Sequence, residues 1–102
     1  MIRHVVLFKL ASNVDAVAAA KVFSALKDLA NKIPGILAIS TGQDNSPEGL
    51  QRGNTHGFTV DFSNAAARDA YLPHPAHQVL GAMIVGIAEG GVDGITVLDW
   101  EM

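Results

Sequence analysis

The sequence contains no cysteine, and this absence excludes several kinds of protein at once. A chain without thiols has no disulfide framework, no thiol nucleophile, no iron–sulfur cluster and no zinc site built on thiolates. Charged residues are also scarce, at 17% of the 102 residues, whereas about 25% is usual for a globular domain. This shortage suggests that another subunit covers part of the surface.

The charge balance and the short apolar runs exclude further classes. Seven basic against ten acidic residues leave a net charge of -3, which is the wrong sign for binding nucleic acid. The longest apolar stretch, Val79 to Ala88, is about half of the ~20 residues that a membrane span needs. The N-terminal stretch, Ile2 to Lys9, carries charge and has no small-residue cleavage site, so we do not interpret it as a signal peptide. We expect no nucleic-acid partner, no membrane partner and a cytoplasmic location.

The length predicts a single domain over residues 1–102. Alternating and helical apolar periods then indicate the order strand, helix, strand, strand, helix, strand, with the second helical region broken at Pro73. This β-α-β-β-α-β order is typical of a ferredoxin-like α+β fold, with both helices on one face of the sheet and the first and third strands adjacent. The expected segments are strands 2–10, 36–41, 55–62 and 95–100, helices 14–33, 63–72 and 75–87, and a loop at 42–53 that is a candidate lid.

Two histidines begin apolar rows on the expected strands. His4 shares a face with the apolar residues of the first strand, and His56 does so on the third strand. We therefore expect the two to be neighbours on the helix-facing side of the sheet, within reach of Tyr71 and His77. His77 falls in the first turn of its helix, where the macrodipole favours neutral imidazole, which can act as a base.

Structural roles remain open for the same residues. His4 and His56 are equally well explained as a hydrogen-bonded pair in the core, and Tyr71 as a core aromatic residue. His74 and His77 have the spacing of half a metal site, but no carboxylate converges on them, so we predict no metal.

A set of segments, in order along nearly the whole chain, matches a known pattern: Met1–Lys9, Ile33–Ile36, Ser46–Leu50, Tyr71–Gln78 and Val97–Trp100. In these segments the chain resembles one known family, the stress-responsive A/B barrel (Dabb) domain proteins. The resemblance implies a ferredoxin-like subunit that pairs with a second copy through its open sheet face to form a dimeric α+β barrel. We expect that face to carry Val5, Leu7 and either Ile95 or Leu98.

The resemblance extends to one branch of this family, the plant polyketide cyclases, and it implies an acid–base reaction for this chain. The resemblance gives Tyr71 and His77 the roles of acid and base, and places His4 and His56 in the substrate pocket. The expected protein is then a homodimer with a small-molecule pocket, acting as a cofactor-free cyclase-like or lyase-like enzyme. The alternative is a non-catalytic stress-response or ligand-binding dimer, in which Phe8, Phe23, Phe58 and Met83 fill the pocket.

Overall fold

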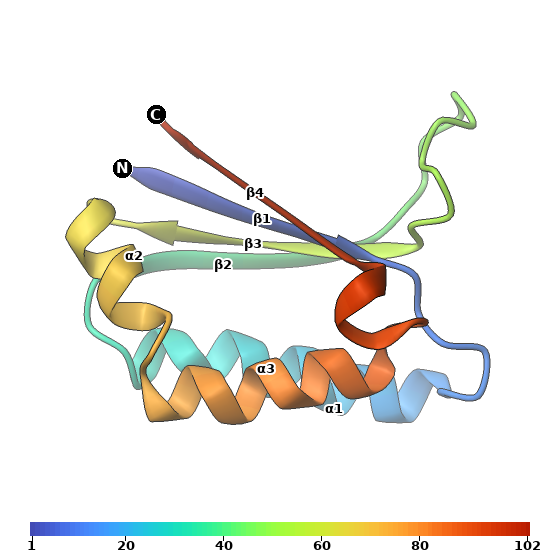
Figure 1. Cartoon of the computed structure of the whole chain (residues 1–102), viewed down its shortest axis with the longest axis horizontal. Coiled ribbons are helices and arrows are strands. Elements are labelled where there is room, and N and C mark those ends of the chain that lie inside the picture. Colours follow the sequence, from blue (N-terminus) through green and yellow to red (C-terminus); the bar gives the residue numbers. More distant parts are fainter.

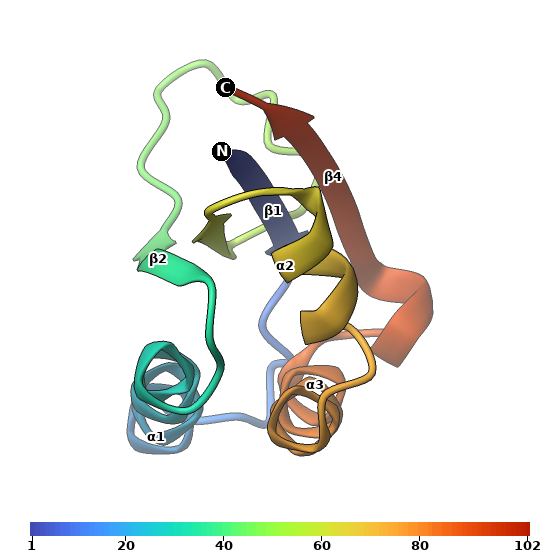
Figure 2. The ribbon, with the colours of Figure 1, turned by 90° about the vertical axis from the view of Figure 1, so that its left-hand side faces the viewer.

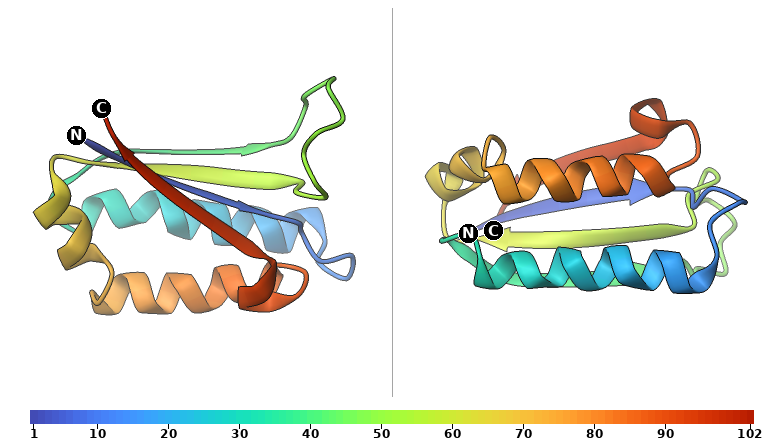
Figure 3. Two further views of the ribbon diagram at one scale, coloured as in Figure 1. Left: turned by 45° about the horizontal axis from the view of Figure 1, so that its top comes forward. Right: turned by 90° about the horizontal axis from the view of Figure 1, so that it is seen from below.

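β1 (Ile2–Phe8) lies inside a four-stranded antiparallel sheet of order β2-β3-β1-β4. The computed structural model describes residues 1–102, and it shows α1 and α3 side by side across one face of this sheet (Figure 1 and Figure 3). The ferredoxin-like α+β fold is therefore confirmed, including the adjacent first and third strands. The other elements are α1 (Ala16–Asp28), β2 (Ile36–Gln43), β3 (His56–Phe62), α2 (Ala65–Tyr71), α3 (Pro75–Ile87) and β4 (Ile95–Glu101), with short 3-10 helices η1 (Leu29–Asn31) and η2 (Gly91–Gly94).

The helix boundaries follow from side chains that cap the backbone. α1 begins after Asp15, whose carboxylate accepts a hydrogen bond from the Ala18 N–H at 2.8 Å. α2 begins after Asn64 in the same way. These acceptors satisfy N–H groups that have no partner within the helix. The first helix therefore begins two residues later than residue 14, where the apolar period had placed its start.

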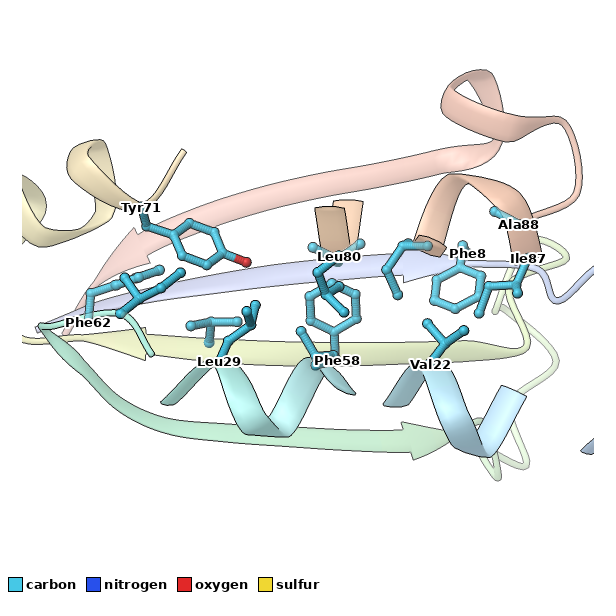
Figure 4. Close-up of a cluster of buried hydrophobic side chains, with 14 of the residues drawn as sticks. Phe8, Val22, Leu29, Phe58, Phe62, Tyr71, Leu80, Ile87 and Ala88 are labelled. Carbon is cyan, nitrogen blue, oxygen red and sulfur yellow. The ribbon is translucent and has the colours of Figure 1, made fainter. Parts of the chain in front are cut away.

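The core lies between the helix-facing side of the sheet and the helices (Figure 4). In β1 and β3 alternate residues point to this side, as the period of a strand requires. Phe8, Val60 and Phe62 are fully buried there, and Leu26 covers them from α1. The buried cluster is Ile2, Val6, Phe8, Val22, Leu26, Leu29, Ile33, Phe58, Val60, Phe62, Tyr71, Leu80, Ile84, Ile87 and Ala88.

The turn before β2 requires glycine at residue 35. Gly35 has a φ of +89°, and a Cβ atom there would lie 2.5 Å from the Cβ of Ala67 on α2. Gly35→Ala is expected to lower the free energy of unfolding by about 2–3 kcal/mol, because backbone strain and the clash add together. Urea denaturation of the parent and the variant measures this loss of stability. The control is Gly49→Ala, which has a φ of +72° but nothing within 4 Å, so equal losses in the two variants would contradict the steric part of the argument.

The face of the sheet opposite the helices is uncovered and partly apolar. Val5 and Leu7 of β1 lie on it beside Leu98 and Trp100 of β4, and the last three of these four are exposed. Of the two β4 residues expected as alternatives, Leu98 is the one on this face. Ile95 pairs with Phe8 and faces the helices, because residues on the two sides of a strand alternate.

The segment between β2 and β3, residues 44–55, rises on this uncovered side (Figure 1). Together with Val5, Leu7 and parts of β2 and β3 it borders an open hollow of about 530 Å³. The segment was expected as a candidate lid, but it lies across the sheet from Tyr71 and His77 and does not cover them.

Candidate functional site

Tyr71, His77 and His4 come together at one end of the helix-facing layer. The Tyr71 and His77 rings have centroids 4.0 Å apart, and the His4 ring stands edge-on to Tyr71 at 6.0 Å. Phe62 packs against the other side of Tyr71 at 4.9 Å. The structure therefore brings together three of the four residues that the sequence singled out.

His77 is held by the turn between α2 and α3. Its Nδ1 atom lies 3.0 Å from the carbonyl oxygen of Leu72. A carbonyl oxygen only accepts, so Nδ1 must carry the hydrogen, and in the neutral ring Nε2 then has a free lone pair. His74 caps α3 by accepting a hydrogen bond from the Ala76 N–H at 3.1 Å. These local bonds orient His77 on the first turn of α3.

Tyr71 is the last residue of α2 and is 1% exposed. Burial raises the pKa of its hydroxyl group above the usual value of 10.0, so the phenol remains protonated and able to donate near neutral pH. Every fully buried side-chain oxygen or nitrogen in the chain has a hydrogen-bond partner, and the Tyr71 oxygen has none. It must therefore keep contact with accessible space, and Figure 4 shows it pointing away from α2 in the direction of Leu80.

Sequence reasoning missed a carboxylate that holds His4. Asp99 on β4 lies opposite His4 in the sheet, and its Oδ1 is 2.7 Å from His4 Nδ1. The other oxygen of Asp99 accepts a hydrogen bond from Arg68 on α2 at 3.2 Å. With Nδ1 donating to Asp99, the Nε2 atom of His4 is left as the free nitrogen. The available signal was that Asp99 continues the apolar row of Ile95 and Val97, as His4 does on β1.

His56 faces the helices as expected, but it is not beside His4. In the register of the sheet His4 lies opposite Val60, and His56 lies opposite Phe8. These positions are four residues apart, which corresponds to roughly 13 Å along the strand. His56 instead stacks on Phe8 and Phe23, with ring centroids 6.1 and 5.9 Å away, and its Nδ1 lies 2.7 Å from the Thr55 hydroxyl oxygen. The prediction that the two histidines are neighbours was wrong.

Burial lowers the pKa of His77 below its usual value of 6.5, and the nearby His4 and His74 rings lower it further, against the raising effect of the Leu72 hydrogen bond. His77 is therefore largely neutral at pH 7. The unfolded chain takes up the proton at a higher pH than the folded chain, so folding stability is lost as pH falls through this window.

We expect the unfolding free energy to drop more steeply as the pH falls below 6.5 in the parent protein than in a His77→Gln variant, because only the parent has the lowered pKa of His77. Urea titrations of both proteins across this range measure the difference. If the unfolding free energies of the two proteins fall in parallel with pH, the lowered pKa of His77 is contradicted.

Neither a metal site nor a membrane span is found in the structure. No three His, Asp or Glu side chains are grouped closely enough to hold a metal ion. His74 and His77, which have the spacing of half a metal site, each use Nδ1 in a hydrogen bond to the backbone. No helix is both long and apolar enough to cross a membrane.

The fold and the uncovered sheet face define a ferredoxin-like α+β protein of the type found in dimeric barrels. The family model for the stress responsive A/B barrel domain, Dabb, matches residues 2–102. The chain therefore belongs to the Dabb family.

Three relatives illustrate the similarity. A dimeric ferredoxin-like protein from Jannaschia is 31% identical, with a TM-score of 0.89 over 99% of this chain and 98% of that one. A stress-response A/B barrel domain-containing protein of Arabidopsis thaliana is 29% identical over 96% of this chain and 81% of its own length. Olivetolic acid cyclase of Cannabis sativa is 25% identical over 78% of this chain and 79% of its own length.

Proposed function

We propose that this protein is a cofactor-free acid–base catalyst of the cyclase or lyase type, which acts on a small carbonyl compound through Tyr71 and His77. The observation that carries the proposal is the contact of these two rings at 4.0 Å, with a free Nε2 on one and an unpartnered hydroxyl group on the other. The similarity to a cyclase agrees with this chemistry.

The two side chains suit complementary roles. His77, neutral at pH 7, removes a proton from the carbon next to the carbonyl group, and the Tyr71 phenol donates a hydrogen bond to the oxygen on which negative charge develops. The resulting enolate attacks a second carbonyl group, and the His77 imidazolium returns its proton to the new alkoxide. These groups supply both the base and the hydrogen-bond donor.

His4 has a supporting role in this proposal. Asp99 holds its Nδ1 at 2.7 Å, so its ring is fixed at the edge of Tyr71 and its Nε2 is left to orient a substrate oxygen. His56 lies outside this cluster and has no part in the proposed step.

A non-catalytic, ligand-binding dimer is the second candidate. It is favoured by the other end of the helix-facing layer, where Phe8, Phe23 and His56 are stacked and leave that end filled with aromatic rings. For both candidates we propose a homodimer in the cytoplasm. The dimeric solved relative and the uncovered apolar sheet face support the self-association.

The proposed proton removal can be tested without knowledge of the natural substrate. A panel of alkyl phenyl ketones and linear β-keto esters is incubated with the protein in deuterated water, and proton NMR follows the loss of the signal next to the carbonyl group. We expect the parent protein to accelerate this exchange for at least one compound. Exchange no faster than with the Tyr71→Phe/His77→Ala double variant across the panel would leave the ligand-binding dimer as the better description.

A further inference from the structure

Two glycines occur inside α3, at positions 81 and 86, although glycine is an unfavourable residue within a helix. Neither has a positive φ, so the backbone does not require glycine at either place. A Cβ atom on Gly86 would meet nothing within 4 Å. A Cβ atom on Gly81 would meet one atom only, Nε2 of His77, at 3.9 Å.

The position that a side chain of residue 81 would occupy is open space, with Nε2 of His77 as the single atom within 4 Å. Gly81 lies one turn after His77 and one turn before Val85, so these three residues share a face of the helix. Val85 lies against η2, where a Cβ atom on Gly91 would be 3.7 Å from its Cγ1, and η2 joins α3 to β4 (Figure 2). On β4, Val97 belongs to the helix-facing row and is nevertheless 55% exposed.

A second observation concerns the polar groups beside this space. The hydroxyl group of Tyr71 makes no hydrogen bond within the chain and therefore borders accessible space, and it points toward Leu80, the residue before Gly81 (Figure 4). The free Nε2 of His77 borders the same space. A hydroxyl group and an imidazole nitrogen that both border open space and make no bond within the chain are available to hydrogen-bond a ligand.

We infer that Gly81 determines which compounds reach His77, because a substrate occupies the place of the side chain that residue 81 lacks. The walls define its class: a small carbonyl compound whose apolar part lies against Val97 and Gly81, and whose oxygen faces Tyr71. This substrate class rests on the proposed function. The claim that a side chain at residue 81 would block access to His77 is the steric part of the inference, and it does not depend on that function.

Access to Nε2 can be measured with diethyl pyrocarbonate, which acylates unprotonated imidazole nitrogen, followed by peptide mass spectrometry. A leucine on a helix points back over the residue four positions earlier, so Gly81→Leu places its side chain over His77. The matched control, Gly86→Leu, covers the exposed Ala82 instead. His56 serves as the internal reference in each variant.

We expect Gly81→Leu to slow acylation of His77 about tenfold, while Gly86→Leu leaves it unchanged. An unchanged rate at His77 in a folded Gly81→Leu variant would overturn the inference. Gly81→Ala, which adds one methyl group, is expected to raise the melting temperature by about 4–8 °C, since alanine favours the helix, and to slow acylation by a smaller factor.

The ketone exchange reaction separates this inference from the proposed function. If Gly81→Leu blocks acylation but the parent catalyses no exchange, the steric inference stands and the catalytic proposal fails. If the parent catalyses exchange and Gly81→Leu does so equally well, the catalytic proposal stands and the role of Gly81 is refuted. If Gly81→Leu loses both acylation and exchange while Gly86→Leu keeps them, the result supports the steric inference and the catalytic proposal together.

Discussion

Replacing His77 by alanine is expected to slow the enzyme-dependent ketone exchange by about 10²–10⁴-fold, the usual contribution of a general base. Tyr71→Phe is expected to slow it as well, because the aromatic ring still fills its place while the hydrogen bond to the developing oxyanion is lost. Both variants should fold, since phenylalanine preserves the packing of Tyr71 and His77 is only half-buried. Circular dichroism and the exchange rate, measured together, separate loss of the base from loss of the fold.

The control for this prediction is the neighbouring histidine. His74→Asn removes an imidazole ring but keeps a side chain that caps helices well. The only bond from His74 to Tyr71 is the backbone N–H to carbonyl hydrogen bond at 3.0 Å, which asparagine retains. Its exchange rate should stay within a few-fold of the parent rate. If His77→Ala exchanges as fast as the parent while the parent exceeds the double variant, the base is another group, and His4 with its Asp99 partner becomes the assignment to examine.

Leu98→Glu is expected to convert a homodimer into a monomer, with the dissociation constant raised by at least about 10³-fold. Leu98 lies on the uncovered face of the sheet beside Val5 and is 62% exposed. In a two-fold dimer formed through this face, each copy would bury an unpaired carboxylate. Sedimentation velocity at low micromolar concentration measures the state of assembly.

The matched control for Leu98 is its neighbour in the strand. Val97 is 55% exposed, but it points to the helix-facing side, so Val97→Glu should leave the dimer intact. Dissociation of both variants would show that the effect does not belong to the uncovered face. A parent protein that is already a stable monomer at this concentration would refute the dimer itself.

The sequence predicted on which side of the sheet a strand residue lies better than it predicted which residues that residue contacts. Alternation shows which side of a strand His4 and His56 occupy, but a shift of the pairing by two residues leaves every side chain on the same side. Both histidines lie toward the beginning of their strands, and in an antiparallel pair the two beginnings are at opposite ends. The register therefore separates them, and the expectation of direct contact failed for this reason.

Local spacing was more informative for Tyr71 and His77. Only a short turn separates α2 from α3, so two residues six positions apart are brought together by nearby backbone alone. Asp99 is different, because it lies 95 positions from His4 in the sequence. The alternating pattern of the sequence places Asp99 in an apolar row, but only the assembled sheet shows which histidine Asp99 contacts.

The pairing of β1 with β4 has a consequence for how the molecule forms. β1 lies between two strands that come much later in the chain, and its ion pair from Arg3 to Asp61 on β3 already spans 58 positions. Contacts of such long range form slowly, because the loop entropy is lost before the contacts are gained. A nascent chain that has emerged as far as α3 already exposes Tyr71 and His77, but Asp99 on β4 has not yet emerged. The acid–base cluster is thus completed late, when β4 docks and gives His4 its carboxylate.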